Sequence, residues 1–278
     1  MVEMILRFTR SYKVKVGGLL FLLILLFGFI GPLTSSKDPT AMVGLLYENP
    51  SASHILGTDN FGRDMFVALM HGTRTSLTIG LVSGLVATFI GTTLGMFAGY
   101  LGGYFDKIIN ALTNLFLVIP PFIILLLVSI SLETRSLYLL AILIGFTSWP
   151  WVTRSVRAQT LSLRNRRHVD IARISGFNIL EILLREILPY IMSYVFMVFI
   201  IQLASGIIQE ATLSMLGLGP FNVVSLGKML QWALLYESMR VGAWWAFIPP
   251  VIVISIITFS LKYVNNGMDE VFNPKLRK

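Results

Sequence analysis

Residues that could carry out chemistry are few in this sequence, and their spacing does not form a catalytic or metal site. The three histidines, His54, His71 and His168, are far apart, and the absence of cysteine excludes disulfides and thiolate metal sites. The stretch 57–64 has the G-x4-G spacing of a phosphate-binding loop but lacks the Lys-Ser/Thr that would reach phosphate and magnesium. No set of nucleophile and base stands out. We therefore expect no catalytic residue, no metal and no cofactor bound by this chain itself.

Uncharged polar side chains form a second group of candidates. Gln202 and Gln209 share one helical face with Ser205, and Glu210 is predicted at the outer end of the same helix. One interpretation is interhelical hydrogen bonding, which is common in membrane proteins. The other is that Gln202, Gln209 and Glu210 line a polar translocation path.

The most charged segment reads RRHVDIARISGFNILEILLREILP and begins at Arg166. Its pattern predicts a short helix over 163–175 that ends at Gly176. Asn178 is then a predicted N-cap, with Glu181 three residues later as in a capping box. From the residues alone, this helix–glycine–helix element is either a basic loop on the membrane surface or a docking element for a cytoplasmic protein.

The elements that position these residues are predicted to be membrane helices. The chain is 55% hydrophobic and 13% charged, whereas soluble domains are about 25% charged. A membrane helix needs about 20 mainly apolar residues. Six segments qualify: 17–33, 75–99, 108–131, 137–152, 190–209 and 243–261. We therefore predict an all-α integral membrane protein with six transmembrane helices, the first of them uncleaved.

Prolines and tryptophans mark three of these segments. The pairs Pro120-Pro121 and Pro249-Pro250 predict kinks in the third and sixth segments. The fourth is short and is predicted to end at Trp149-Pro150-Trp151, which is typical of a membrane interface.

The distribution of lysine and arginine predicts the orientation. With the N-terminus inside, the inner segments hold 16 of the 22 basic residues. Because positive charge collects on the cytoplasmic side, both termini and the segment 154–189 are predicted to be cytoplasmic, in a plasma or inner membrane. This cytoplasmic bias explains the net charge of +8 without a nucleic-acid partner, and membrane lipid is the expected surrounding.

The predicted spans contain no charged residue or histidine. Proton-driven carriers usually need ionisable groups inside the bilayer, so energy for uphill transport is expected from another subunit. The second span carries a ridge of small residues that lets another helix approach closely, within this chain or in a partner. The ridge consists of Ser83, Ala87, Gly91, Gly95, Gly99 and Gly103.

The charged segment also carries a family resemblance. Asp170-Ile171-Ala172, Gly176, Ile187 and Pro189 resemble the EAA-x3-G-x9-to-11-I-x-L-P signature of membrane subunits of binding-protein-dependent ABC importers, with Ile171 in place of the middle alanine. Other stretches resemble the dipeptide/oligopeptide/nickel permease branch, so the likeness covers nearly the whole chain. These stretches are 54–64, 73–77, 98–106, 210–219 and 273–277.

The resemblance implies a type I ABC importer transmembrane domain, the second permease subunit of a heterodimer. Residues 1–74 would hold the cytoplasmic tail, first helix and outer segment, 75–265 the permease core with its coupling segment 154–189, and 266–278 a cytoplasmic tail. The implied partners are a homologous second permease, two cytoplasmic ATPase subunits that bind ATP and Mg, and an extracellular solute-binding protein facing 34–74 and 211–242. ATP hydrolysis would belong to the ATPase subunits, so this chain is not expected to be an enzyme.

In this family the signature forms a coupling helix that contacts the ATPase. The residues implied at that contact are Asp170, Ala172 and Gly176, with Arg166, Arg167 and Arg173 as ion-pair partners. A dipeptide or oligopeptide is the first solute expected, and an oligosaccharide or a nickel or metal chelate is the alternative. An ATP-independent channel or carrier, and a membrane enzyme or assembly scaffold, are alternatives of a different class.

Overall fold

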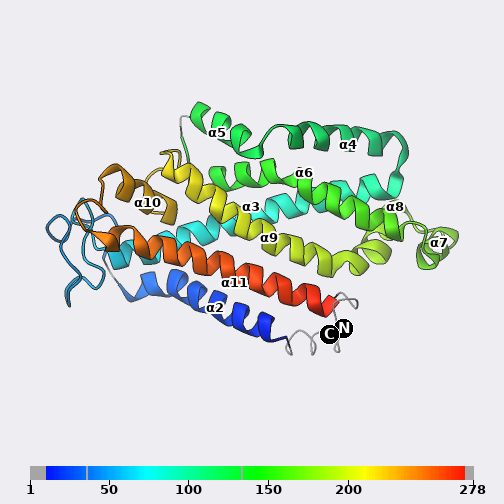
Figure 1. Cartoon of the computed structure of the whole chain (residues 1–278). Coiled ribbons are helices and arrows are strands. Elements are labelled where there is room, and N and C mark those ends of the chain that lie inside the picture. The colour runs from blue at the N-terminus through cyan, green and yellow to red at the C-terminus, as the bar shows by residue number, and fades with distance from the viewer. Residues whose placement is uncertain (1–10, 36, 133, 273–278) are drawn as a thin grey trace.

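The computed structural model describes residues 11–35, 37–132 and 134–272, and this part of the chain folds into a long bundle of helices (Figure 1). Arg7, Arg10 and the 273–277 motif lie outside the described residues. In chain order the elements are α2 (Tyr12–Phe29), η1 (Gly31–Thr34), α3 (Met65–Leu101), α4 (Gly103–Val118), α5 (Pro121–Ser131), α6 (Leu137–Leu163), α7 (Arg167–Ile174), α8 (Ile179–Glu181), η2 (Ile182–Ile187, a π-helix), α9 (Leu188–Met215), α10 (Leu226–Leu235), η3 (Trp244–Ala246) and α11 (Ile248–Phe272).

Within the described residues, five helical stretches are long and apolar enough to cross a membrane, and a bent pair makes a sixth only if it is one span. The bent pair is α4 and α5, which meet at 79°. The bend predicted at Pro120-Pro121 is therefore present, but it is a break between two helices rather than a kink within one helix. Ile119 is extended because a residue that precedes proline is driven out of the helical region, and Pro121 then starts α5.

Two other expectations about proline-containing segments are wrong. Pro249 and Pro250 lie in the first turn of α11, where proline is tolerated, so they begin the helix rather than kink it. α6 does not end at the Trp149-Pro150-Trp151 belt but continues to Leu163 with Pro150 inside it. Its continuation is held by packing, because Val152 and Val156 are fully buried.

The small-residue ridge of α3 packs against α6, so the interpretation of the ridge as a packing surface within the chain is confirmed. A Cβ added at Gly91 would lie 2.4 Å from Val152 Cβ, and one at Gly95 would lie 2.8 Å from Thr153 O. Gly103 is beyond the end of α3 and has no neighbour within 4 Å of an added Cβ. The two helices therefore touch at backbone distance, as small residues allow.

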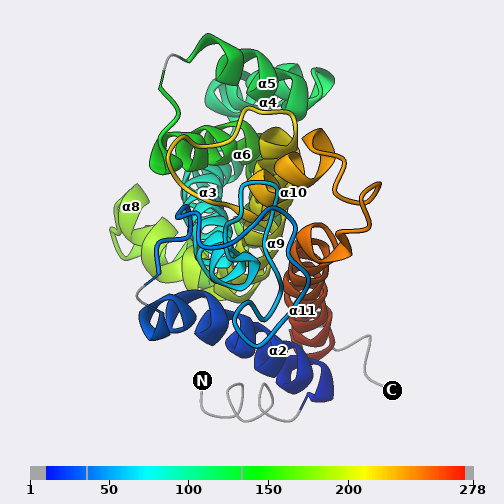
Figure 2. The ribbon, with the colours of Figure 1, turned by 90° about the vertical axis from the view of Figure 1, so that its left-hand side faces the viewer.

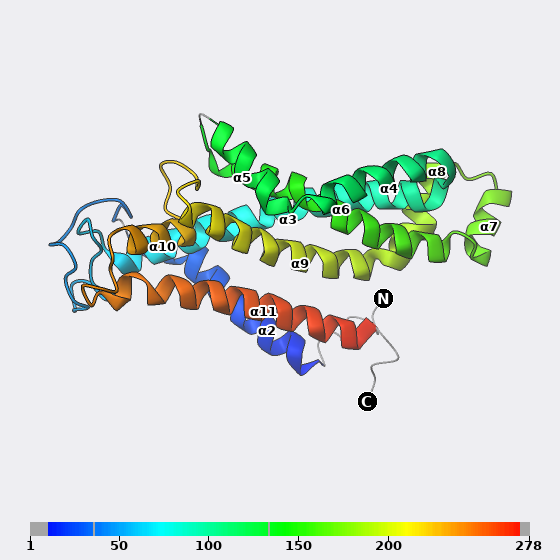
Figure 3. The same cartoon turned by 45° about the horizontal axis from the view of Figure 1, so that its top comes forward.

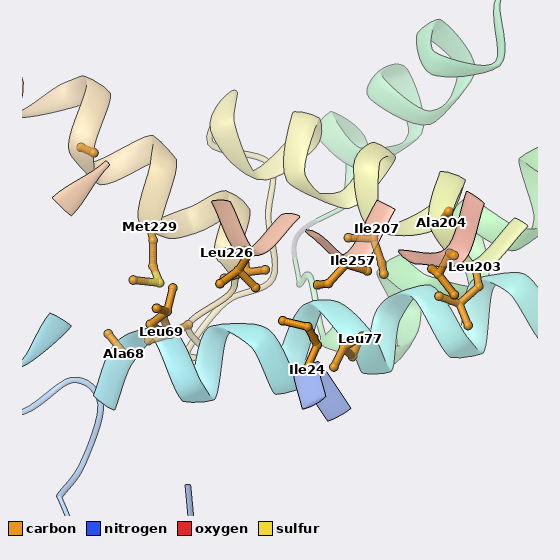
Figure 4. Packing of buried hydrophobic residues seen from close by; sticks show 14 of the residues in the cluster. Ile24, Ala68, Leu69, Leu77, Leu203, Ala204, Ile207, Leu226, Met229 and Ile257 are labelled. Carbon is orange, nitrogen blue, oxygen red and sulfur yellow. The ribbon is translucent and has the colours of Figure 1, made fainter. Parts of the chain in front are cut away.

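The helices form layers around α3 and α9 (Figure 3). α4 and α5 lie along one side against α6, while α2 and α11 pair on the other side. One apolar core joins α3 and α9 to α2, α10 and α11, and Figure 4 shows Leu203 and Ile207 of α9 above Leu77 of α3. A second core joins α3, α6, α7, η2 and α9.

The two ends of the bundle differ in character. α7 forms one end, and the start of α2 and the end of α11 lie on the same side (Figure 1). The other end carries α10 and the irregular segments before α3 and between α9 and α11 (Figures 1 and 2).

Candidate coupling segment and translocation path

α7 is an eight-residue amphipathic helix whose two faces have different surroundings. Val169 is 0% exposed and Ala172 is 5% exposed, and both belong to the apolar core shared with α3 and α6. On the opposite face Ile171 is 58% exposed and Ile174 is 88% exposed. Ala172 therefore anchors the helix, and its side chain does not form part of the exposed face.

Gly176 ends α7 as the spacing predicts. Its φ is +81°, and no atom would lie within 4 Å of an added Cβ. The Gly176 amide donates to Arg173 O and the Phe177 amide donates to Ala172 O, both at 3.1 Å. This pair of bonds is the Schellman arrangement, which requires a left-handed residue at this position. Backbone conformation, rather than lack of space, therefore demands glycine here.

The second helix of the segment begins with the predicted capping box. The Asn178 side chain accepts from the Glu181 amide, and the Glu181 carboxylate accepts from the Asn178 amide, each at 2.9 Å. The next six residues form a π-helix, which the sequence pattern did not predict. Pro189, in the first turn of α9, lacks an amide hydrogen and crowds the carbonyl four residues before it, and a π turn accommodates that crowding.

The three arginines predicted as ion-pair partners do not have equivalent positions. Arg166 and Arg167 are exposed at the start of α7. Arg173 instead donates to Tyr100 Oη of α3 at 3.1 Å and to Arg164 O at 3.3 Å. It also contacts Asp170 at 3.2 Å. Arg173 is thus bonded within the chain although 40% of its side chain is exposed, and its partner Asp170 is 51% exposed.

A cavity of about 420 Å³ lies between α6, α9 and the break between α4 and α5. Its described lining residues include Phe122, Trp151, Gln202, Ser205 and Gln209, and none of the described lining residues is charged. Gln202 and Gln209 therefore face the same space, as predicted from their spacing.

The two glutamines also form hydrogen bonds, one to the neighbouring helix α6 and one within α9. Gln202 Nε2 donates to Ser148 O of α6 at 3.1 Å. Gln209 Nε2 donates to Ser205 Oγ at 3.0 Å. Gln202 thus makes the predicted interhelical hydrogen bond, and both glutamines line the cavity, while their place in a translocation path stays a prediction. Ser148 is a polar cavity residue that the sequence analysis missed because no motif marks it.

Glu210 does not line this cavity, and its predicted place at the end of the helix is wrong. It lies inside α9, is 0% exposed, and accepts from Ser76 Oγ at 2.9 Å and from Ser214 Oγ at 2.6 Å. Ser76 Oγ in turn accepts from the Leu226 amide of α10 at 3.2 Å. A carboxyl group in an apolar core must be hydrogen-bonded, and this one joins α3, α9 and α10.

The glycine-flanked stretch 57–64 folds as a turn that leads into α3. The Asp59 carboxylate accepts from the Arg63 guanidinium at 2.7 Å, and that guanidinium lies 3.7 Å from the Trp232 ring centroid. Asp64 caps α3 and accepts from Lys37 Nζ at 3.0 Å. Burial raises the pKa of Asp64, but its hydrogen bonds outweigh this effect and leave the pKa below the usual range. The side chains of Asp59, Arg63 and Asp64 are therefore used by the fold.

Membrane-spanning helices around an uncharged cavity, with an amphipathic helix at one end, fit a membrane subunit of a transporter. The family described as "Binding-protein-dependent transport system inner membrane component" matches residues 91–278. The chain belongs to this family, and it is a permease subunit of an ABC importer with the type I transmembrane fold.

Several named permeases match over almost the whole chain, among them the following three. The oligopeptide transport system permease protein OppC of Bacillus subtilis (strain 168) is 30% identical over 278 residues, which is 99% of this chain and 90% of the relative. The dipeptide transport system permease protein DppC of Haemophilus influenzae (strain ATCC 51907 / DSM 11121 / KW20 / Rd) is 31% identical over 279 residues, with 98% and 93% covered. DppC of Bacillus subtilis (strain 168) is 30% identical over 278 residues, with 98% and 85% covered.

Proposed function

We propose that this permease forms half of the path of a peptide importer and that α7 is the contact for an ATPase subunit. The observation that carries the second part is the exposed face of α7, with Ile174 88% exposed at the end of the bundle. An apolar side chain held out on a rigid, anchored helix is well suited to enter a groove on a partner. Asp170 and Ile171 are exposed about one turn before it, and Arg166 and Arg167 are exposed at the start of the helix.

The end that carries α7 is the cytoplasmic end in this proposal. Three of the basic segments predicted to be inside lead to the same end of the bundle, because α2 begins there, α11 ends there and α7 lies there (Figure 1). The ATPase subunits would bind ATP and Mg on this side and hydrolyse the ATP, while this chain contributes no catalytic residue. The irregular segments at the opposite end would then meet the extracellular solute-binding protein (Figure 2).

The cavity beside Gln202 and Gln209 is the proposed path. A homologous second permease subunit would close its open side and form the heterodimer. Amide side chains can both donate and accept hydrogen bonds, so they can exchange bonds with the backbone amides of a passing peptide. Uncharged walls also hold a charged solute weakly enough to release it. The relatives are named for oligopeptide and dipeptide transport, which supports a peptide as the solute.

Reconstitution of the whole complex tests the proposal. The chain, the second permease and both ATPase subunits would be placed in proteoliposomes with the binding protein, and uptake of labelled trialanine would be measured with and without ATP. We expect ATP-dependent uptake in the complete complex and none with this chain alone. Uptake of an oligosaccharide or a nickel chelate in place of the peptide would show that the transported solute is not a peptide. Uptake without ATPase subunits would refute the mechanism.

Two substitutions test whether α7 couples ATP hydrolysis to transport. Asp170→Lys reverses the charge on the exposed face, and Gly176→Trp forces a bulky residue into the left-handed turn. Both should lower peptide-stimulated ATP hydrolysis while the subunit still inserts into the membrane. Normal stimulation of ATP hydrolysis in both variants would show that α7 is not the contact for the ATPase subunit.

A further inference from the structure

α7 is joined to the membrane helices through few side chains. The buried Val169 and Ala172 fix its inner face, and the His168 ring stacks on Tyr190 of α9 with centroids 4.4 Å apart. The apolar contacts lead to the core that α3, α6 and α9 share, and the ring stacking leads to α9. Polar bonds from α7 to α3 and α6 come from Arg173.

Each of the three guanidinium nitrogens of Arg173 has a different partner. Nε donates to Tyr100 Oη at 3.1 Å, one terminal nitrogen donates to Arg164 O at 3.3 Å, and the other donates to Asp170 Oδ1 at 3.2 Å. The guanidinium carbon also lies 5.3 Å from the centroid of the Tyr100 ring. This fork geometry belongs to arginine, and a lysine ammonium cannot reproduce it.

Two of these partners are at helix ends, where a displacement of α7 would pull on them. Tyr100 is 8% exposed and lies in the last turn of α3. Arg164 is the C-cap of α6, and its carbonyl is among the groups that a helix end leaves without an intrahelical partner. Arg173 supplies that partner from another helix.

α3 and α6 themselves pack at backbone distance along the glycine ridge. A displacement of α7 that pulls on Tyr100 and Arg164 therefore acts on one rigid pair of helices. α6 lines the cavity through Ser148 and Trp151. The chain of contacts runs from α7 through Arg173 to the wall of the path.

We propose that Arg173 is a positioning residue that transmits movement of α7 to α3 and α6, and that it is not an ion-pair partner of the ATPase. The proposal rests on the proposed function in one respect, namely that α7 is the element that the ATPase moves. The proposal gives Arg173 a different role from that of Arg166 and Arg167, which are exposed and can face a partner.

The first experiment uses the full chain alone, in detergent, and measures hydrogen–deuterium exchange of residues 167–176. Arg173→Gln should speed exchange in this segment by about tenfold relative to wild type, because each lost bond lowers local stability. Lys107→Gln is the control, since it removes one exposed cation at the same end of the bundle. Unchanged exchange in Arg173→Gln would show that Arg173 does not hold α7 to α3 and α6 and would overturn the proposal. This outcome does not depend on whether the complex transports peptide.

The second experiment uses the assembled complex with the trialanine-loaded binding protein. We expect Arg173→Gln to retain both ATPase subunits on purification and to keep basal ATP hydrolysis. The stimulation by loaded binding protein should fall by about tenfold, Arg173→Lys should restore only part of it, and Tyr100→Phe should reduce it less than Arg173→Gln. Loss of the ATPase subunits from Arg173→Gln would make Arg173 a docking contact and overturn the proposal. A wild-type complex whose ATP hydrolysis is not stimulated by loaded binding protein would count against the proposed function. The exchange experiment would still decide whether Arg173 holds α7 to α3 and α6.

Discussion

Replacing Gly91 by alanine tests the contact that makes α3 and α6 a single unit. The added Cβ would lie 2.4 Å from Val152 Cβ and 3.0 Å from Trp149 O. Carbon atoms in contact prefer about 3.5–4.0 Å, so the helices would have to separate. Neither obstacle is the flexible end of a side chain. Overpacking of this kind costs about 1–3 kcal/mol, and we expect the upper end of that range.

A matched glycine isolates the packing effect. Gly18 also lies inside a helix, α2, but an added Cβ there meets nothing within 4 Å. Alanine is the better helix former by about 1 kcal/mol at either position, so that gain cancels in the comparison. The difference between Gly91→Ala and Gly18→Ala is therefore about 3 kcal/mol of packing.

Thermal unfolding of the purified subunit in detergent measures this difference. Each kcal/mol of unfolding free energy shifts the midpoint of thermal unfolding by about 2–4 °C for a chain of about this size. The midpoints of the two variants should therefore differ by roughly 6–12 °C at one fixed scan rate. Gly95→Ala should also destabilise, since its Cβ would lie 2.8 Å from Thr153 O. A midpoint for Gly91→Ala equal to that of Gly18→Ala would refute backbone contact between α3 and α6.

Three further predictions concern the path, the exposed helix and the outer turn. Replacing Gln202 and Gln209 together by leucine should abolish peptide uptake while the subunit still inserts, and uptake at the wild-type rate would exclude both from the path. Ile174→Asp should release the ATPase subunits on purification, with a stability change within about 0.5 kcal/mol because the side chain is 88% exposed; retained subunits would contradict docking at this face. The Asp64 carboxylate has a lowered pKa, so its stabilisation is complete above about pH 4 and is lost as the pH falls through that pKa. Asp64→Asn, which still caps α3, should flatten the fall in thermal stability toward acid, and an unchanged pH profile would contradict this role.

Features that depend on neighbouring residues were predictable from the sequence. The membrane class follows from composition, and most of the spans follow from runs of apolar residues. The turn at Gly176 and the capping box at Asn178 were also predicted, because the bonds that form them join residues at most five apart. The ridge of small residues on α3 was visible as a four-residue repeat, although its partner was not.

Only the tertiary structure decided features that depend on contacts between distant segments. α6 continues through Pro150 because its buried residues pack on α3, about 60 positions earlier. Glu210 lies in the core because Ser76, 134 residues away, donates to it. Arg173 appeared to be one of three equivalent cations until Tyr100, 73 residues before it, was found beside it. The sequence by itself determined the membrane class, most of the spans and the helix–glycine–helix element at Gly176, since hydrophobicity and capping are local. Which of those residues face a partner and which hold the bundle together was decided by the packing of helices, because a side chain's role depends on what the fold brings next to it.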